Sequence, residues 1–267
     1  PAEAGDRFGS ALAGHDAMLA IGVPREDHGS NVDTGMVHLV DGLTGEQIWD
    51  RQGLFADDRA EAGDRFGEVL DLGQHTLVVG VPREDVGSKK NGGILHVYEF
   101  ERTYLQDGPL FWANSRAYTR KGIDQSNIGG GDRLGAAVVL LEIPGEDNIL
   151  LVGSPGDRVS GEDGAGTVLI MELTSGSRRK HLSSWTHTSD GVPGSPMEDG
   201  GFGSSVVLGP WGSLLVSAPG VAVGGETQAG ELLSTRTLDD WASVDQDTRG
   251  VKTAAERRDK FASAVGS

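Results

Sequence analysis

Charged side chains that could bind a ligand gather in four segments, each of which runs from a proline to a glycine. We call them the proline–glycine loops; they span residues 24–35, 82–93, 155–166 and 219–230. Their arginines and carboxylates can form charge-assisted hydrogen bonds with a partner, and loops on a rigid scaffold commonly carry binding residues. The candidate ligand-binding residues in them are Arg25, Asp27, Arg83, Asp85, Arg158 and Asp163.

One tryptophan joins these candidates from outside the loops. Trp211 stands in a Gly209-Pro210-Trp211-Gly212 turn that has no counterpart elsewhere in the chain. A tryptophan exposed on a turn is a frequent anchor of binding interfaces. We therefore predict that Trp211 contributes to ligand binding.

Motifs that would indicate catalysis are absent from the sequence. There is no Gly-x-Ser-x-Gly and no His-Glu-x-x-His. The run Gly129-Gly130-Gly131 has no Lys-Ser/Thr after it, so it does not indicate a phosphate loop. Glycoside hydrolysis by a pair of carboxylates stays an open alternative because the chain has 40 acidic residues, although no particular pair stands out. We expect a protein without enzymatic activity and without a cofactor.

The charge balance disfavours some classes of binding partner. The 23 basic and 40 acidic residues give a net charge of −17, which disfavours nucleic acid and anionic membranes as partners. The longest apolar run, Ala136 to Leu141, is too short to insert into a membrane. The chain has no cysteine. A protein or carbohydrate ligand is the expectation that remains.

The proline–glycine loops belong to an internal repeat. A five-residue opening segment reads Gly-Asp-Arg-Phe-Gly in its first two copies and varies in the next three, and its apolar residues are separated by 58, 68, 68 and 59 positions. The first four copies each precede a proline–glycine loop. Each repeat also carries one tryptophan, for which we expect a place between neighbouring units. The opening segments are residues 5–9, 63–67, 131–135, 199–203 and 258–262, and the tryptophans are Trp49, Trp112, Trp185 and Trp241.

The segments within each repeat are β-like. Leu77 to Val79 and Ile149 to Val152 are apolar runs too short for helices and bounded by turn residues. We expect one strand to begin at Phe8 and its copies, and a turn or two of helix within Ala254 to Lys260. Four strands in about 60 residues predict an all-β protein, a β-propeller of four-stranded antiparallel blades, with four full repeats and the first strand of a fifth.

The repeat resembles the FG-GAP repeat of integrin α-subunits and of secreted bacterial proteins. The resemblance rests on Phe8-Gly9 with Gly22-Val23-Pro24 and on Phe66-Gly67 with Gly80-Val81-Pro82. Pro24-Arg25-Glu26-Asp27 is similar to the bacterial branch, notably that of actinomycetes. The resemblance implies a propeller, usually of seven blades, a secreted or extracellular location, and partners bound on one face in an adhesion-like role.

The calcium loops of that family are missing. Members that bind calcium carry alternating carboxylates between the Phe-Gly and Gly-Ala-Pro strands, because Ca²⁺ prefers hard oxygen ligands. The corresponding connections here, such as residues 13–17 and 209–212, do not contain three alternating carboxylates. We therefore predict no integrin-type metal site.

The number of repeats does not determine whether the blades close into a ring. We divide residues 1–267, taken as a single propeller or propeller fragment, into repeats of approximately 4–61, 62–129, 130–198 and 199–256 and a partial repeat 257–267. The strand at Phe261 is the candidate to pair where a ring closes or where this chain associates; the alternative is a remnant at a domain boundary.

The recurring charges also have a structural interpretation, which we weigh above the functional one. All four proline–glycine loops have a constant spacing of 11, which indicates the same architectural role in each, with Asp and Gly satisfying turn backbone. The pairs Asp6-Arg7, Asp64-Arg65 and Asp132-Arg133 are interpreted as turn caps with an ion pair between blades. The leading functional hypothesis is a non-catalytic interaction domain; the alternatives are a lectin and an accessory domain of a larger secreted enzyme.

Overall fold

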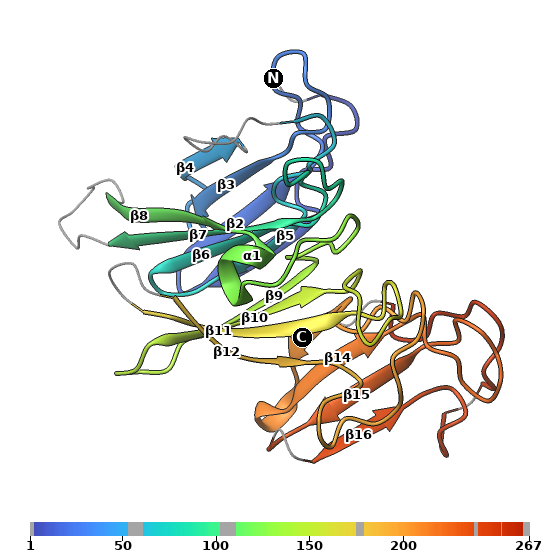
Figure 1. The fold of residues 1–267 in the computed structure, drawn as a ribbon. Helices are drawn as coiled ribbons and strands as arrows, with labels where there is room; N and C mark the ends of the chain where they lie inside the picture. Colours follow the sequence, from blue (N-terminus) through green and yellow to red (C-terminus); the bar gives the residue numbers. More distant parts are fainter. Residues whose placement is uncertain are drawn as a thin grey trace.

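The computed structural model describes residues 3–52, 61–101, 111–174, 179–237, 240–251 and 253–263 as four antiparallel sheets of four strands (Figure 1). In every sheet the strands pair in chain order, each with the next. Sheet 1 has β1 (Ala11–His15), β2 (Met18–Val23), β3 (Met36–Asp41) and β4 (Gln47–Gln52), and sheet 2 has β5 (Val69–Leu72), β6 (Thr76–Val81), β7 (Ile94–Glu101) and β8 (Phe111–Tyr118). Sheet 3 has β9 (Ala137–Leu141), β10 (Asn148–Ser154), β11 (Thr167–Leu173) and β12 (Arg179–Trp185), and sheet 4 has β13 (Val206–Leu208), β14 (Leu214–Ala218), β15 (Glu231–Thr235) and β16 (Trp241–Val244).

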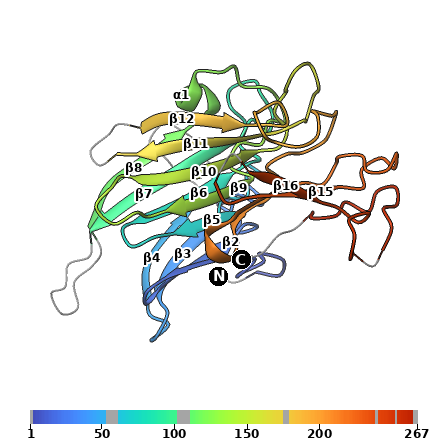
Figure 2. The same cartoon turned by 90° about the horizontal axis from the view of Figure 1, so that it is seen from below.

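Each sheet lies within one repeat, and the sheets follow one another in a row. Sheet 2 lies between sheets 1 and 3 in both views (Figure 1 and Figure 2), and sheets 1 and 4 stand at opposite ends of the row in Figure 1. Neighbouring sheets make contact through their first strands, β1 with β5, β5 with β9 and β9 with β13. The all-β class and the repeated four-stranded sheets are thus confirmed, in an arrangement that is propeller-like.

The hydrophobic core consists of three layers between neighbouring sheets. Val37 and Leu39 of sheet 1 pack with Leu77 and Val79 of sheet 2, and similar layers separate sheets 2 and 3 and sheets 3 and 4. All six residues of β6 are buried because this strand has a sheet on each side. Covering both faces explains why the strands of the middle repeats have apolar runs rather than alternation.

Each of the last four opening segments pairs with the proline–glycine loop of the preceding repeat. The backbone N–H of Phe66 donates to the Thr34 carbonyl at 2.9 Å, and those of Leu134, Phe202 and Phe261 make the same bond to the next three loops. Gly35 and Phe66 form a parallel bridge there. A side chain on Gly22 would overlap the Gly67 carbonyl, so a glycine at that place allows the sheets to approach each other closely.

The caps predicted for the opening segments are present. Asp64 Oδ2 accepts the backbone N–H of Glu61 at 2.6 Å, and Asp6, Asp132 and Asp259 accept the N–H three residues before them in the same way. The ion pair predicted between units is present at Arg65, whose Nη2 lies 3.8 Å from Asp33 Oδ2 of the preceding loop.

The predicted places of the tryptophans agree with the described ring contacts. The Trp49 ring meets Tyr98 edge-on at 5.4 Å between sheets 1 and 2, and Trp185 meets Trp241 at 5.5 Å between sheets 3 and 4. The side chain of Trp112 lies outside the described residues.

Two local expectations were wrong. The strand expected from Phe8 begins at Ala11, because Arg7 and Gly9 have φ of 59° and 80° and form a turn. Residues 254–260 contain no helix; α1 instead spans Arg120–Asp124, with Thr119 as its N-cap. The strand predicted for the fifth repeat continues from Phe261 into residues 264–267, which lie outside the described residues. Residues 258–261 pair with the loop of sheet 4 at residues 227–229.

Candidate functional site

The predicted binding residues lie at two opposite ends of the sheets. In a meander, the connection after the second strand and the connection after the first strand leave from opposite ends. The six charged candidates follow β2, β6 or β10 in the proline–glycine loops, whereas Trp211 lies between β13 and β14. The structure therefore separates Trp211 from the other six residues.

Two of the candidate carboxylates hold their own loops together. Asp27 Oδ1 accepts the N–H of Asp33 at 2.9 Å, and Asp85 Oδ1 accepts that of Asn91 at 2.8 Å. Each carboxylate thus closes a turn across six residues in the same place of its loop. For this pair the structural interpretation of the constant loop length explains the residues.

The side chains of the remaining candidates differ in their exposure and in the groups that they already contact. Arg83 Nε donates to Glu68 Oε2 at 3.0 Å, and 43% of its side chain is exposed. Arg158 and Asp163 pair at 3.4 Å on the surface of the third loop, where such pairs contribute little to stability. Arg25 is half-buried, and its backbone N–H donates to the Asp6 carbonyl.

Trp211 is the most exposed large apolar side chain of the described residues. Its side chain is 87% exposed, and its φ of 58° places it in a left-handed turn. The guanidinium carbon of Arg236 lies 5.8 Å from the ring centroid, a cation–π distance. A fixed turn that presents an aromatic ring with one face beside a cation fits a contact residue.

A cleft of about 410 Å³ opens between sheets 2 and 3, beside the second proline–glycine loop. Arg83 and Arg133 contribute positive charge to it, and Arg133 has no ion pair or side-chain hydrogen bond with any described residue. The other lining residues are Glu68, Val69, Pro82, Asn91 and Ala136.

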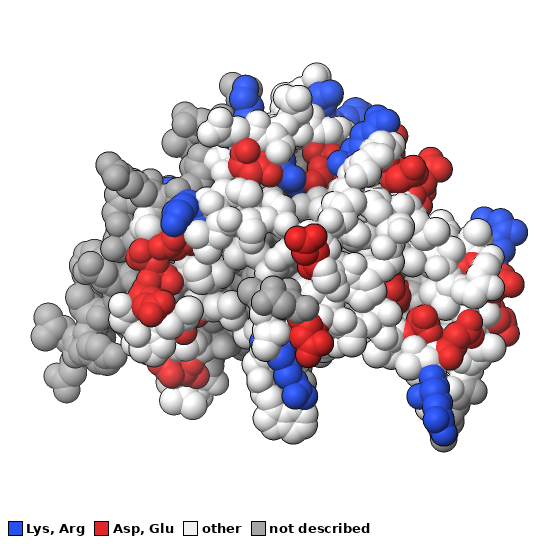
Figure 3. Space-filling model, turned by 60° about the horizontal axis from the view of Figure 1, so that its bottom comes forward, with Lys and Arg blue, Asp and Glu red and all other residues white. Residues whose placement is uncertain are grey.

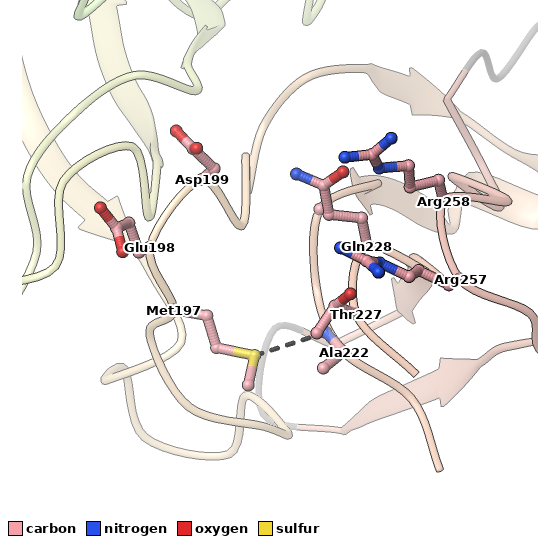
Figure 4. A pocket seen from close by; sticks show the side chains of 9 residues that line it. Met197, Glu198, Asp199, Ala222, Thr227, Gln228, Arg257 and Arg258 are labelled. Carbon is pink, nitrogen blue, oxygen red and sulfur yellow. Dashed lines mark hydrogen bonds between the residues drawn. The ribbon is translucent and has the colours of Figure 1, made fainter. Parts of the chain in front are cut away.

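A second cleft, of about 370 Å³, lies beside the fourth loop (Figure 4). Glu198 and Asp199 stand on one side of it, and Arg257 and Arg258 stand on the other. All four charged residues are exposed. At the edge of the cleft, Met197 Sδ accepts the N–H of Ala222 at 3.4 Å. This contact joins the segment that carries Glu198 and Asp199 to the fourth loop. Neither cleft was predicted, because each combines residues from an opening segment and a loop of different repeats.

Buried ion pairs fasten the sheets together away from these clefts. Arg120 of α1 lies 2.9 Å from Asp124 and 2.7 Å from Asp157 of the third loop. A buried side-chain hydrogen bond of 2.9 Å also joins His187, which follows sheet 3, to Glu231 of β15. Removing one partner of such a pair leaves a buried charge, so these groups fit a structural role.

Two carboxyls with a raised pKa accept backbone N–H groups. Burial raises the pKa of Asp71, although its Oδ2 accepts the N–H of Leu140 across sheets 2 and 3 at 2.6 Å. Burial likewise raises the pKa of Asp132, the cap of the third opening segment. Neither carboxyl lines one of the two clefts. In the described parts of the chain, no three His, Asp or Glu side chains are placed to hold a metal ion.

Acidic side chains on the face in Figure 3 occur in several separate groups, with lysines and arginines among them. None of the described helices is long and apolar enough to cross a membrane.

Comparison with protein-family models found no matching family, and a search of curated proteins found no match.

Proposed function

We propose that this chain is a non-catalytic binding domain of the FG-GAP type, a propeller or part of one, that recognises a protein partner through the end that carries the proline–glycine loops. The observation that carries the proposal is that both clefts lie at this end and present exposed arginines. Arginine is enriched at binding interfaces because its planar group forms several directed hydrogen bonds.

The arrangement of the remaining charged groups supports this role. Asp27, Asp85 and Asp71 all bind backbone N–H groups of loops or strands, so these carboxylates act in the scaffold. The scaffold holds the cleft residues rigidly, because each opening segment is pinned to the preceding loop by backbone hydrogen bonds. An extracellular, adhesion-like setting is the one that we propose with the FG-GAP resemblance.

A protein array tests the proposal directly. We expect the purified chain to bind a defined subset of immobilised extracellular proteins, and the triple variant R133M/R257M/R258M to lose that binding while it keeps the native circular dichroism spectrum. Panels of chromogenic esters, phosphates, glycosides and peptides should show no turnover. Hydrolysis that disappears on changing one carboxylate pair would overturn the proposal.

Sugar binding is a second candidate, which the exposed ring of Trp211 favours. A glycan array separates the two functions. Binding to a glycan that W211A removes and the triple variant keeps would support a lectin, whereas an array without signal would count against it.

A further inference from the structure

Arg133 is held at its backbone, while its guanidinium makes no ion pair or side-chain hydrogen bond with the described residues. Its N–H donates to the Asn91 carbonyl at 3.0 Å, and its φ of 55° belongs to the turn of the opening segment. The next residue, Leu134, is fully buried. A side chain whose base is fixed loses less freedom when it binds a ligand, which favours binding.

At the junction between sheets 1 and 2, the arginine at the same position of the opening segment has carboxylate partners within the chain. Arg65 has a φ of 57°, and its N–H donates to the Asp33 carbonyl at 3.1 Å. Its guanidinium lies 3.8 Å from the Asp33 carboxylate and 3.9 Å from that of Glu68. An arginine in this slot therefore lies between two carboxylates, one from the loop and one from the start of the next sheet.

Both carboxylates are replaced in the junction between sheets 2 and 3. Asn91 has the position of Asp33, two residues before the loop glycine, and Ala136 has the position of Glu68, two residues after the apolar residue of the opening segment. Both replacements line the cleft of about 410 Å³. The arginine has been kept, its internal partners are gone, and open space lies beside it.

The junction between sheets 3 and 4 has no such unpaired charge. There the arginine slot holds Gly201, and the two partner slots hold Gly164 and Ser204. Arginine and carboxylates have been lost together, which leaves no unmatched group. Of the three junctions between described sheets, the one between sheets 2 and 3 is where the cation remains without its anions.

A second cation adjoins Arg133. Arg83 lines the same cleft, and its Nε is anchored to Glu68 at 3.0 Å. Lys89 and Lys90 of the same loop are exposed. The lining of the cleft carries two arginines and one glutamate, so it is positive on balance within a chain of net charge −17, which favours an anionic group at this place.

We propose that the cleft between sheets 2 and 3 binds the side-chain carboxylate of an acidic peptide segment, with Arg133 as the principal contact and Arg83 as the second. The inference rests on the proposed binding function and names the chemistry of its ligand. The apolar lining, Val69, Pro82 and Ala136, is aliphatic and suits the methylene groups of an aspartate or glutamate. Among the described residues that line the cleft, none has an aromatic ring to stack on a sugar.

The test is an NMR titration of the full chain at low salt with the peptide acetyl-Gly-Asp-Gly-amide. We expect saturable shifts at the Nε–Hε group of Arg133 and the amide of Asn91, and no such shifts with acetyl-Gly-Asn-Gly-amide. R133M should weaken binding about tenfold or more. The matched control R7M removes the exposed arginine at the same position of the first opening segment, where φ is 59°, and should bind as the native chain does.

A double variant separates the loss of a site from the loss of a fold. N91D/A136E restores both carboxylates of the Arg65 junction around Arg133, so it should abolish peptide binding while Arg133 and the folded structure are kept. Native affinity in R133M or in N91D/A136E would overturn the inference.

Two further measurements define the ligand class. Tighter binding of glucuronate than of the aspartyl peptide would overturn the peptide assignment in favour of an acidic glycan. If a protein from the array binds equally well to R133M and loses affinity for R257M/R258M, this inference fails while the proposed binding function stands.

Discussion

The first two opening segments have the same five residues and opposite surroundings. Residues 5–9 and 63–67 both read Gly-Asp-Arg-Phe-Gly, and the arginines have φ of 59° and 57°. In both segments the aspartate accepts a backbone N–H at 2.6 Å. Yet Phe8 is 66% exposed, whereas Phe66 is 1% exposed.

The difference arises from the packing around each phenylalanine. Residues 63–66 are pinned to the loop of sheet 1, and Phe66 enters the layer between sheets 1 and 2. Phe8 has the same turn, and the ring near it is that of His38 at 5.8 Å. The local sequence therefore determines the turn, while the neighbouring sheet supplies the stabilisation, about 2–3 kcal/mol for a buried phenylalanine.

The largest expected effect comes from truncating the two phenylalanines. F66A should lower the free energy of unfolding by about 3–5 kcal/mol, because it leaves a cavity between two sheets. F8A should lower it by less than about 1 kcal/mol, because its side chain is already in water. Urea denaturation of both variants measures the contrast, and equal losses would refute it.

The close approach of the sheets gives the next effect. G22A should cost at least about 2 kcal/mol, because the new methyl group would overlap the backbone of Gly67. G9A has open space around its Cβ and a φ of 80°, so only the backbone strain of about 1 kcal/mol applies. Thermal unfolding of the pair separates packing from conformational strain.

The caps should show a smaller contrast of the same sign. D64A removes a buried cap and should cost about 2 kcal/mol, since a hydrogen bond to a charged group is lost. D6A removes the half-buried copy and should cost about 1 kcal/mol or less. A cost that is larger for D6A would show that the caps act independently of burial.

The smallest effect is a pH dependence. Burial raises the pKa of Asp132 in the folded protein, so the folded state binds more protons than the unfolded state between the ordinary carboxyl pKa and the raised one. The contribution of Asp132 to the stability of the native chain therefore falls as the pH rises through this window. D132N has no such proton, and its stability relative to the native chain should rise over the same window. Denaturation curves from pH 3 to pH 7 follow this difference, and its absence would contradict the assignment.

Much of the architecture was predictable because the repeat is local in sequence. The recurring opening segments, proline–glycine loops and tryptophans predicted four all-β units, and each sheet lies within its repeat. The helix was misplaced because Ala254 to Lys260 is rich in helix-forming residues but pairs its backbone with the loop of sheet 4. The FG-GAP resemblance stays a prediction.

The candidate site was predictable only in part. The proline–glycine loops were named from the sequence, and Arg83 does line a cleft. Arg133 was interpreted as part of a recurring turn, and this interpretation holds for its backbone. The signal that would have revealed it is the loss of the two acidic residues at the slots of Asp33 and Glu68, which gains meaning once those residues are seen around Arg65.

The sequence by itself determined the strands, the turns and the caps, because these depend on residues within a few positions of one another. Glycines and capping aspartates select the turn wherever the pentapeptide occurs. Only the tertiary structure decided which phenylalanine is buried, which arginine finds its carboxylates and where a cleft opens. Those outcomes depend on contacts between repeats, where one substitution in a neighbouring unit changes the surroundings of an unchanged residue.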